Sequence, residues 1–141
     1  MSRADAVAAA EAAAAVLARD PRVRLVYLFG SAADPTSRTV RDVDLAVLLE
    51  PSPTPDELLR LRADLVSVSG AELDLVALDG APVVLACEIA ETGRCLHANP
   101  PEAETDFVVR ARARYWDWKP FLDEQWRIMG ERLEERRGPA T

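Results

Sequence analysis

The fold of this chain is decided by two apolar stretches, VRLVYLFGS at residues 23–31 and DVDLAVLL at residues 42–49. Both are rich in β-branched and other apolar residues, which is typical of buried strands. A Gly-Ser turn therefore ends the first strand and two carboxylates begin the second, with ten residues between Ser31 and Asp42. Side chains two apart in a strand project from the same face, so we expect Asp42 and Asp44 to lie side by side.

The pair Asp42 and Asp44 predicts a cation site. Two carboxylates held this close repel each other unless a positive charge lies between them. Mg²⁺ is the natural occupant, because it binds carboxylate oxygens and keeps coordination positions open for phosphate. The pattern therefore indicates a site for phosphoryl-type transfer.

The rest of the chain alternates helical and strand patterns. We expect helices over residues 4–18, 56–68 and 82–91, a third strand over 72–78, a short edge strand over 95–97, and a helical stretch over 102–137 that Pro120 kinks or splits. The first two strands are joined by too few residues for a helical crossover, so they should pair antiparallel. The fold class is α/β in an α+β layered arrangement, with a small mixed or antiparallel sheet flanked by helices.

A chain of 141 residues fits one main core. We expect this core over residues 1–100, a C-terminal helical segment over 101–137 that packs on the core or on a partner, and a frayed tail over 138–141. The C-terminal segment carries apolar residues every three or four positions, namely Phe107, Ala111, Tyr115, Trp118, Leu122, Trp126, Met129 and Leu133. Such a stripe usually packs on its own domain, but Trp and Tyr are also favoured anchors of interfaces, and both interpretations stay open.

Asp74 in the third strand is a candidate third carboxylate. If the second and third strands pair, Asp74 comes within reach of Asp42 and Asp44, since neighbouring strands lie about 4.8 Å apart. Three carboxylates can hold two metal ions for in-line displacement at phosphorus, and Asp74 would be placed to accept the proton of the attacking hydroxyl. Glu72 shares the face of Asp74 and is expected to be an outer neighbour.

The Gly-Ser turn and two nearby arginines are candidate phosphate ligands. Gly30 lets the backbone come close to phosphate groups, and the amide and hydroxyl of Ser31 can bond to them. Arg38 and Arg41 lie between the two halves of the motif and can reach a triphosphate. Surface arginines more often simply solvate a face, which is the alternative for these two.

Composition and net charge argue against several classes of protein. The net charge of −7 argues against a protein whose main task is to bind nucleic acid through its phosphates. Two cysteines and one histidine are too few for a disulfide framework or a zinc site. The alanine-rich N-terminal run contains charged residues and resembles neither a transmembrane span nor a signal peptide, so we expect a cytoplasmic protein that does not contact a membrane.

The spacing of Gly30-Ser31 and Asp42-Val43-Asp44, with Asp74 in an ELDLV context, resembles the signature of the polymerase-β-like nucleotidyltransferase superfamily. The small size resembles its minimal nucleotidyltransferases, the MNT group. The stretch YWDWKPF at residues 115–121, followed by a charged helix, is similar to the C-terminal end of MNT-type antitoxins, which pair with HEPN-domain toxins.

The resemblance implies an activity and a partner. It implies transfer of AMP from ATP, with two Mg²⁺ ions, to a tyrosine of a HEPN ribonuclease toxin, which silences the toxin. It assigns the metal and catalytic roles to Asp42, Asp44 and Asp74. Every motif position is present, including Gly30 and Ser31, which favours an active enzyme. Two alternatives remain, a non-catalytic antitoxin that occludes the toxin and a nucleotidyltransferase for small molecules such as aminoglycosides.

Overall fold

A computed structural model describes residues 1–137 of the chain. Its strands are β1 (Val23–Phe29), β2 (Val43–Leu49), β3 (Leu73–Ala77) and β4 (Arg94–Ala98). Its helices are α1 (Arg3–Leu17), the short 3₁₀ helix η1 (Gly30–Ala33), α2 (Pro55–Ser69), α3 (Val83–Thr92) and α4 (Glu102–Arg137). These elements agree with the predicted ones to within a few residues at each end.

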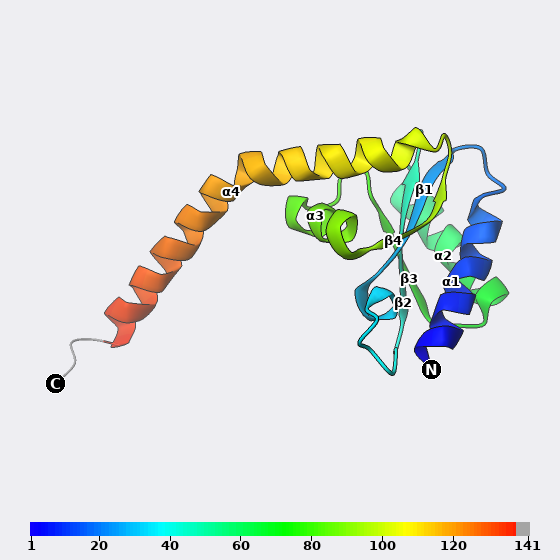
Figure 1. Cartoon of the computed structure of the whole chain (residues 1–141), viewed down its shortest axis with the longest axis horizontal. Coiled ribbons are helices and arrows are strands. Elements are labelled where there is room, and N and C mark those ends of the chain that lie inside the picture. Colours follow the sequence, from blue (N-terminus) through cyan, green and yellow to red (C-terminus); the bar gives the residue numbers. More distant parts are fainter. Residues whose placement is uncertain (138–141) are drawn as a thin grey trace.

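The four strands form one mixed sheet in the order β3-β2-β1-β4 (Figure 1). β1 and β2 pair antiparallel, which confirms the prediction drawn from their short connection. β2 and β3 pair parallel, because α2 carries the chain back across the sheet between them. β4 adds antiparallel to the other edge of β1. The two central strands are therefore the two that carry the predicted motif.

Helices cover both faces of the sheet. α1 and α2 pack on one face, where Val43, Leu45 and Val47 of β2 are buried. α3 and the first part of α4 pack on the other face, over Leu25 and Tyr27 of β1. Side chains of β2 alternate between the two faces, so the intervening positions of β2 point toward the α3 side.

Alanine lets α1 lie close to the sheet. Ala6, Ala10 and Ala13 of α1 are completely buried, and their single methyl groups leave little distance between helix and strands. The helix begins at a capping residue, because the Asp5 amide donates to the Ser2 hydroxyl oxygen at 3.1 Å. The alanine-rich pattern thus supplies both helix propensity and tight packing.

α4 is one helix of 36 residues, and only its first part lies on the body of the protein (Figure 1). Pro120 lies inside the helix, which changes direction about half-way along without splitting. The apolar stripe is buried at Ala111, which is 3% exposed, whereas Trp126 is 61% exposed. The expected frayed tail, residues 138–141, lies outside the described residues. Within residues 1–137, no helix has both the length and the apolar character needed to span a bilayer.

The close packing of α1 on the sheet predicts which alanine positions tolerate a larger side chain. Ala10→Leu forces three extra carbon atoms between helix and sheet and should lower the free energy of unfolding by about 1–3 kcal/mol. Ala12→Leu adds the same atoms at an exposed position of the same helix and should change it by less than about 0.5 kcal/mol. Chemical denaturation of both variants tests the packing, and an equal loss in both would contradict it.

Candidate active site

β2 and β3 place two carboxylates next to each other. The parallel register pairs Asp44 directly with Asp74, and the antiparallel register pairs Phe29 with Asp44. Because Val43 and Leu45 are buried against α1 and α2, Asp44 projects from the opposite face of the sheet. Asp74 occupies the matching position of β3 and shares that face, as the sequence predicted.

Gly30 is the point at which the two halves of the motif touch. Its φ is +73°, a left-handed conformation that side chains with a Cβ rarely adopt. A Cβ placed on Gly30 would overlap the Oδ2 atom of Asp44 and lie 3.3 Å from its Cγ atom. The Asp44 carboxylate therefore lies directly against the Gly30 backbone, where only glycine leaves room for it.

Asp44 is half-buried and faces two other carboxylates. Burial raises the pKa of the Asp44 carboxyl above its ordinary value, and the charges of Asp74 and Asp42 raise it further. Ionisation of Asp44 is therefore disfavoured in the protein without a ligand, and a bound cation would offset the repulsion between the carboxylates. Raised pKa values of this origin are frequent at functional sites.

Arg62 is a site residue that the sequence analysis did not identify. Its Nε atom donates to the Leu73 carbonyl at 2.8 Å and lies 3.6 Å from Oδ1 of Asp74. Arg62 belongs to α2, which packs on the other face, and its side chain reaches Asp74 because β3 is the edge strand. No local pattern signals such a contact, since it depends on the position of β3 in the sheet.

The three carboxylates converge without forming a closed cluster. Within residues 1–137, no three His, Cys, Asp or Glu side chains stand close enough together to hold a metal ion. Asp42 is exposed immediately before β2, and Asp74 is exposed beside Arg62. The donor set nevertheless suits Mg²⁺, because it consists of carboxylate oxygens whose mutual repulsion a cation would offset. The metal-ligand roles of Asp42, Asp44 and Asp74 remain predictions.

The other predicted site residues are all exposed at the surface. Ser31 is exposed in η1, and Glu72 is exposed just before β3. Arg38 and Arg41 are exposed in the segment between η1 and β2, and their phosphate roles remain predictions. The N-terminus anchors this segment, because the Val40 amide donates to the Met1 carbonyl at 2.9 Å and the Met1 ammonium donates to the Val40 carbonyl at 3.1 Å.

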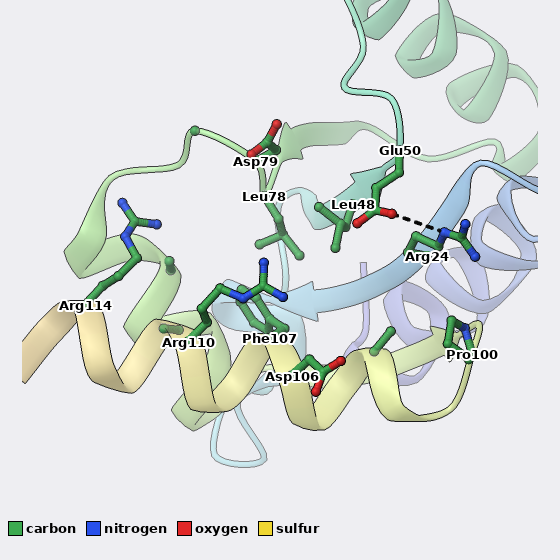
Figure 2. Close-up of a pocket in the computed structure, with 14 residues that line it drawn as sticks. Arg24, Leu48, Glu50, Leu78, Asp79, Pro100, Asp106, Phe107, Arg110 and Arg114 are labelled. Carbon is green, nitrogen blue, oxygen red and sulfur yellow. Dashed lines mark ion pairs between the residues drawn. The ribbon is translucent and has the colours of Figure 1, made fainter.

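A cavity of about 510 Å³ lies on the same sheet face, at the other end of the strands (Figure 2). Its floor includes Leu48, Leu78 and Phe107, and its rim includes the ion pair between Arg24 and Glu50, with Nε and Oε2 3.6 Å apart. Leu48 is four residues beyond Asp44 along β2, which corresponds to about 13 Å. The cavity is therefore separate from the carboxylates.

Comparison with known proteins identifies the family. Residues 11–102, which contain the whole motif, match the family described as polymerase beta, nucleotidyltransferase. This chain belongs to that nucleotidyltransferase family. The matched part includes every strand and the Gly30, Asp44 and Asp74 positions that the geometry brings together. The enzyme class and the fold expected from the sequence are therefore confirmed.

Relatives within the family are minimal nucleotidyltransferases. The chain is 34% identical over 97 residues to the protein adenylyltransferase MntA of Shewanella oneidensis. The aligned region covers 67% of this chain and 68% of the relative. It is also similar to the crystal structure of a toxin–antitoxin with AMP-PNP, at 26% identity and a TM-score of 0.72, over 87% of this chain and 98% of that chain.

A further solved relative shows the same fold at lower identity. It is a complex of a tri-AMPylated Shewanella oneidensis HEPN toxin with its MNT antitoxin, matched at 23% identity and a TM-score of 0.60, over 83% of this chain and 96% of that chain. The resemblance to minimal nucleotidyltransferases of the antitoxin type is thereby confirmed, both by sequence and by fold.

The contact between Gly30 and Asp44 can be tested by adding one methyl group. Gly30→Ala should lower the melting temperature and weaken binding of an ATP analogue, because the new Cβ displaces the Asp44 carboxylate. Gly70→Ala is the matched control, since Gly70 also has a positive φ of +69° but meets nothing within 4 Å. It should show only the backbone cost of about 1–2 kcal/mol and bind the analogue normally. Equal nucleotide affinity in the two variants would contradict this role of Gly30.

The raised pKa of Asp44 predicts a pH-dependent stability. Ionisation of Asp44 opposes folding, so its cost is absent near the ordinary aspartate value of 3.8 and appears as the pH rises through the pKa of the folded state. Asp44→Asn should therefore unfold at higher denaturant concentration than the wild type at pH 7 in EDTA. The difference should shrink as the pH falls toward 4. A variant that is less stable than the wild type at pH 7 would refute this.

Proposed function

We propose that this chain is a protein adenylyltransferase of a toxin–antitoxin pair, which transfers AMP from ATP to a tyrosine hydroxyl of a HEPN ribonuclease toxin in the cytoplasm. The observation that carries the proposal is the pairing of Asp44 with Asp74 on one sheet face, with Asp44 lying against Gly30. The relative named as a protein adenylyltransferase and the similar toxin–antitoxin with AMP-PNP support the same activity and ATP as the substrate.

The proposed reaction needs a nucleotide held at the Gly-Ser turn. The Ser31 amide and hydroxyl donate to phosphate oxygens, and the left-handed backbone of Gly30 lets the phosphates come close. Arg38 and Arg41, exposed in the following segment, are free to turn toward the triphosphate. Asp42, Asp44 and Asp74 would hold two Mg²⁺ ions, which when bound neutralise charge on the triphosphate and on the leaving pyrophosphate.

The acceptor reacts at the α-phosphorus. The tyrosine oxygen forms the new P–O bond, the bond to pyrophosphate breaks, and the hydroxyl proton passes to Asp74. Asp74 suits this role because its side chain is 59% exposed and can be reached from outside the protein. Arg62 acts as a positioning residue, since its guanidinium is fixed to the Leu73 carbonyl and lies beside Asp74.

Intact mass spectrometry of the toxin tests the activity. After incubation with this chain, ATP and Mg²⁺, the toxin should gain one or more AMP units. Asp42→Ala combined with Asp44→Ala should reduce the rate by more than about a hundredfold, because the nucleotide then lacks its metal ligands. Asp64→Ala, an exposed aspartate of α2, is the control and should leave the rate unchanged.

Two experimental results would favour one of the alternative functions instead. A stable complex without any gain of mass would favour neutralisation by occlusion, particularly if the double alanine variant still protected cells from the toxin. Release of pyrophosphate that depends on an aminoglycoside-type acceptor, with no protein present, would favour the small-molecule enzyme.

A further inference from the structure

From Tyr115 onward, α4 carries an apolar stripe that is partly buried at first and exposed toward its end. The stripe consists of Tyr115, Trp118, Leu122, Trp126, Met129 and Leu133. It continues the face of α4 that packs on α3 and the sheet through Phe107 and Ala111. Trp126, Met129 and Leu133 are 61%, 51% and 55% exposed, so the stripe runs past the end of the surface that buries its first part.

Ion pairs do not explain what this stripe binds. Some charged side chains of this part of α4 pair with one another, as Lys119 does with Asp123 and Arg127 does with Glu124 and Glu131. These pairs satisfy part of the charge of the helix locally, and the stripe itself carries no charged side chain. The partner surface that complements the stripe must therefore be mainly apolar, in the manner of an amphipathic helix that lies in a groove.

The size of the stripe suits one side of a protein interface. Three of the six side chains are more than half exposed and three are partly buried, and together they offer on the order of 500 Å². A standard interface takes about 800 Å² from each partner, so the stripe supplies more than half of one side and neighbouring side chains the rest. Two copies paired only through this stripe would fall short of that area, which favours a different protein that also contacts the body of the chain.

We infer that this stripe is the docking surface for the toxin and that it holds the toxin on the catalytic face. The inference rests on the proposed function, and the similar toxin–antitoxin structure supports a hetero-complex. The stripe follows the α3 side of α4, and Asp44 and Asp74 project from the sheet face that α3 also covers. Figure 1 shows the second half of α4 bending and extending away from the body of the protein, where a partner can reach it.

This placement separates holding the acceptor from reacting with it. The distal part of α4 extends beyond the sheet (Figure 1), so the stripe is placed to hold the toxin and the carboxylates to react with it. Losing the stripe should then raise the toxin concentration needed for half-maximal transfer and leave the maximal rate unchanged.

The test compares two variants that each replace one tryptophan and one other apolar side chain with glutamate. Trp126→Glu with Met129→Glu places two charges on the stripe. Val109→Glu with Trp116→Glu removes one tryptophan and one aliphatic residue from the other side of α4, where they are 61% and 66% exposed. All four positions are exposed, so both variants should melt at the wild-type temperature. The stripe variant should bind the toxin at least about thirtyfold more weakly, whereas the control should bind like the wild type.

Binding of the toxin, binding of an ATP analogue and AMP transfer are measured separately. In the stripe variant, the half-maximal toxin concentration should rise while analogue affinity and maximal rate stay the same. Wild-type affinity in the stripe variant, or an equal loss in the control, would overturn the docking surface. A wild-type chain that dimerises alone, and becomes monomeric in the stripe variant, would overturn it in favour of a second copy. If the wild type binds the toxin without transferring AMP and only the stripe variant loses binding, the docking surface stands and the proposed activity fails.

Discussion

The contact of the Asp44 carboxylate with the Gly30 backbone is the constraint on which the site depends. It joins the end of β1 to the start of β2, and it requires both a left-handed glycine and the antiparallel register that pairs Phe29 with Asp44. The parallel register with β3 then fixes Asp74 at the same level. A shift of either register by one residue would turn one carboxylate to the face that α1 and α2 bury.

Packing on the far face of the sheet maintains these registers. Val43, Leu45 and Val47 are buried under α1 and α2, so β2 cannot slide without exposing them. The site thereby gains a rigid base, while its own side chains carry an electrostatic cost that is seen in the raised pKa of Asp44. Clustered carboxylates on a stable sheet repel each other until a positively charged ligand binds, which is typical of a functional site.

Sequence reasoning predicts what depends on local pattern and misses what depends on the packed whole. The apolar runs and the short connection sufficed for β1, β2 and their antiparallel pairing, and strand periodicity placed Asp44 and Asp74 on one face. Arg62 was not predictable, because its approach to Asp74 requires β3 to be the edge strand. The close cluster of Asp42, Asp44 and Asp74 is not assembled in the described residues, since spacing sets the face of a side chain but not its rotamer.

The long C-terminal helix shows a second limit. Helical periodicity correctly predicts that α4 has one apolar face. It does not tell how much of that face the rest of the domain covers. Here the body ends before the stripe does, so Ala111 is core while Leu133 of the same stripe is exposed. The same core-like pattern therefore ends as an exposed apolar surface.

The position of a nucleotide-bound metal on the sheet can be measured directly. Mn²⁺ with a non-hydrolysable ATP analogue broadens amide signals of nearby residues in an NMR spectrum of the labelled chain. A metal held at the carboxylates should broaden Gly30, Ser31, Asp44 and Asp74 most strongly, and His97 on the edge strand less. Broadening centred on Leu48 and Leu78, at the cavity on the other end of the sheet, would contradict it.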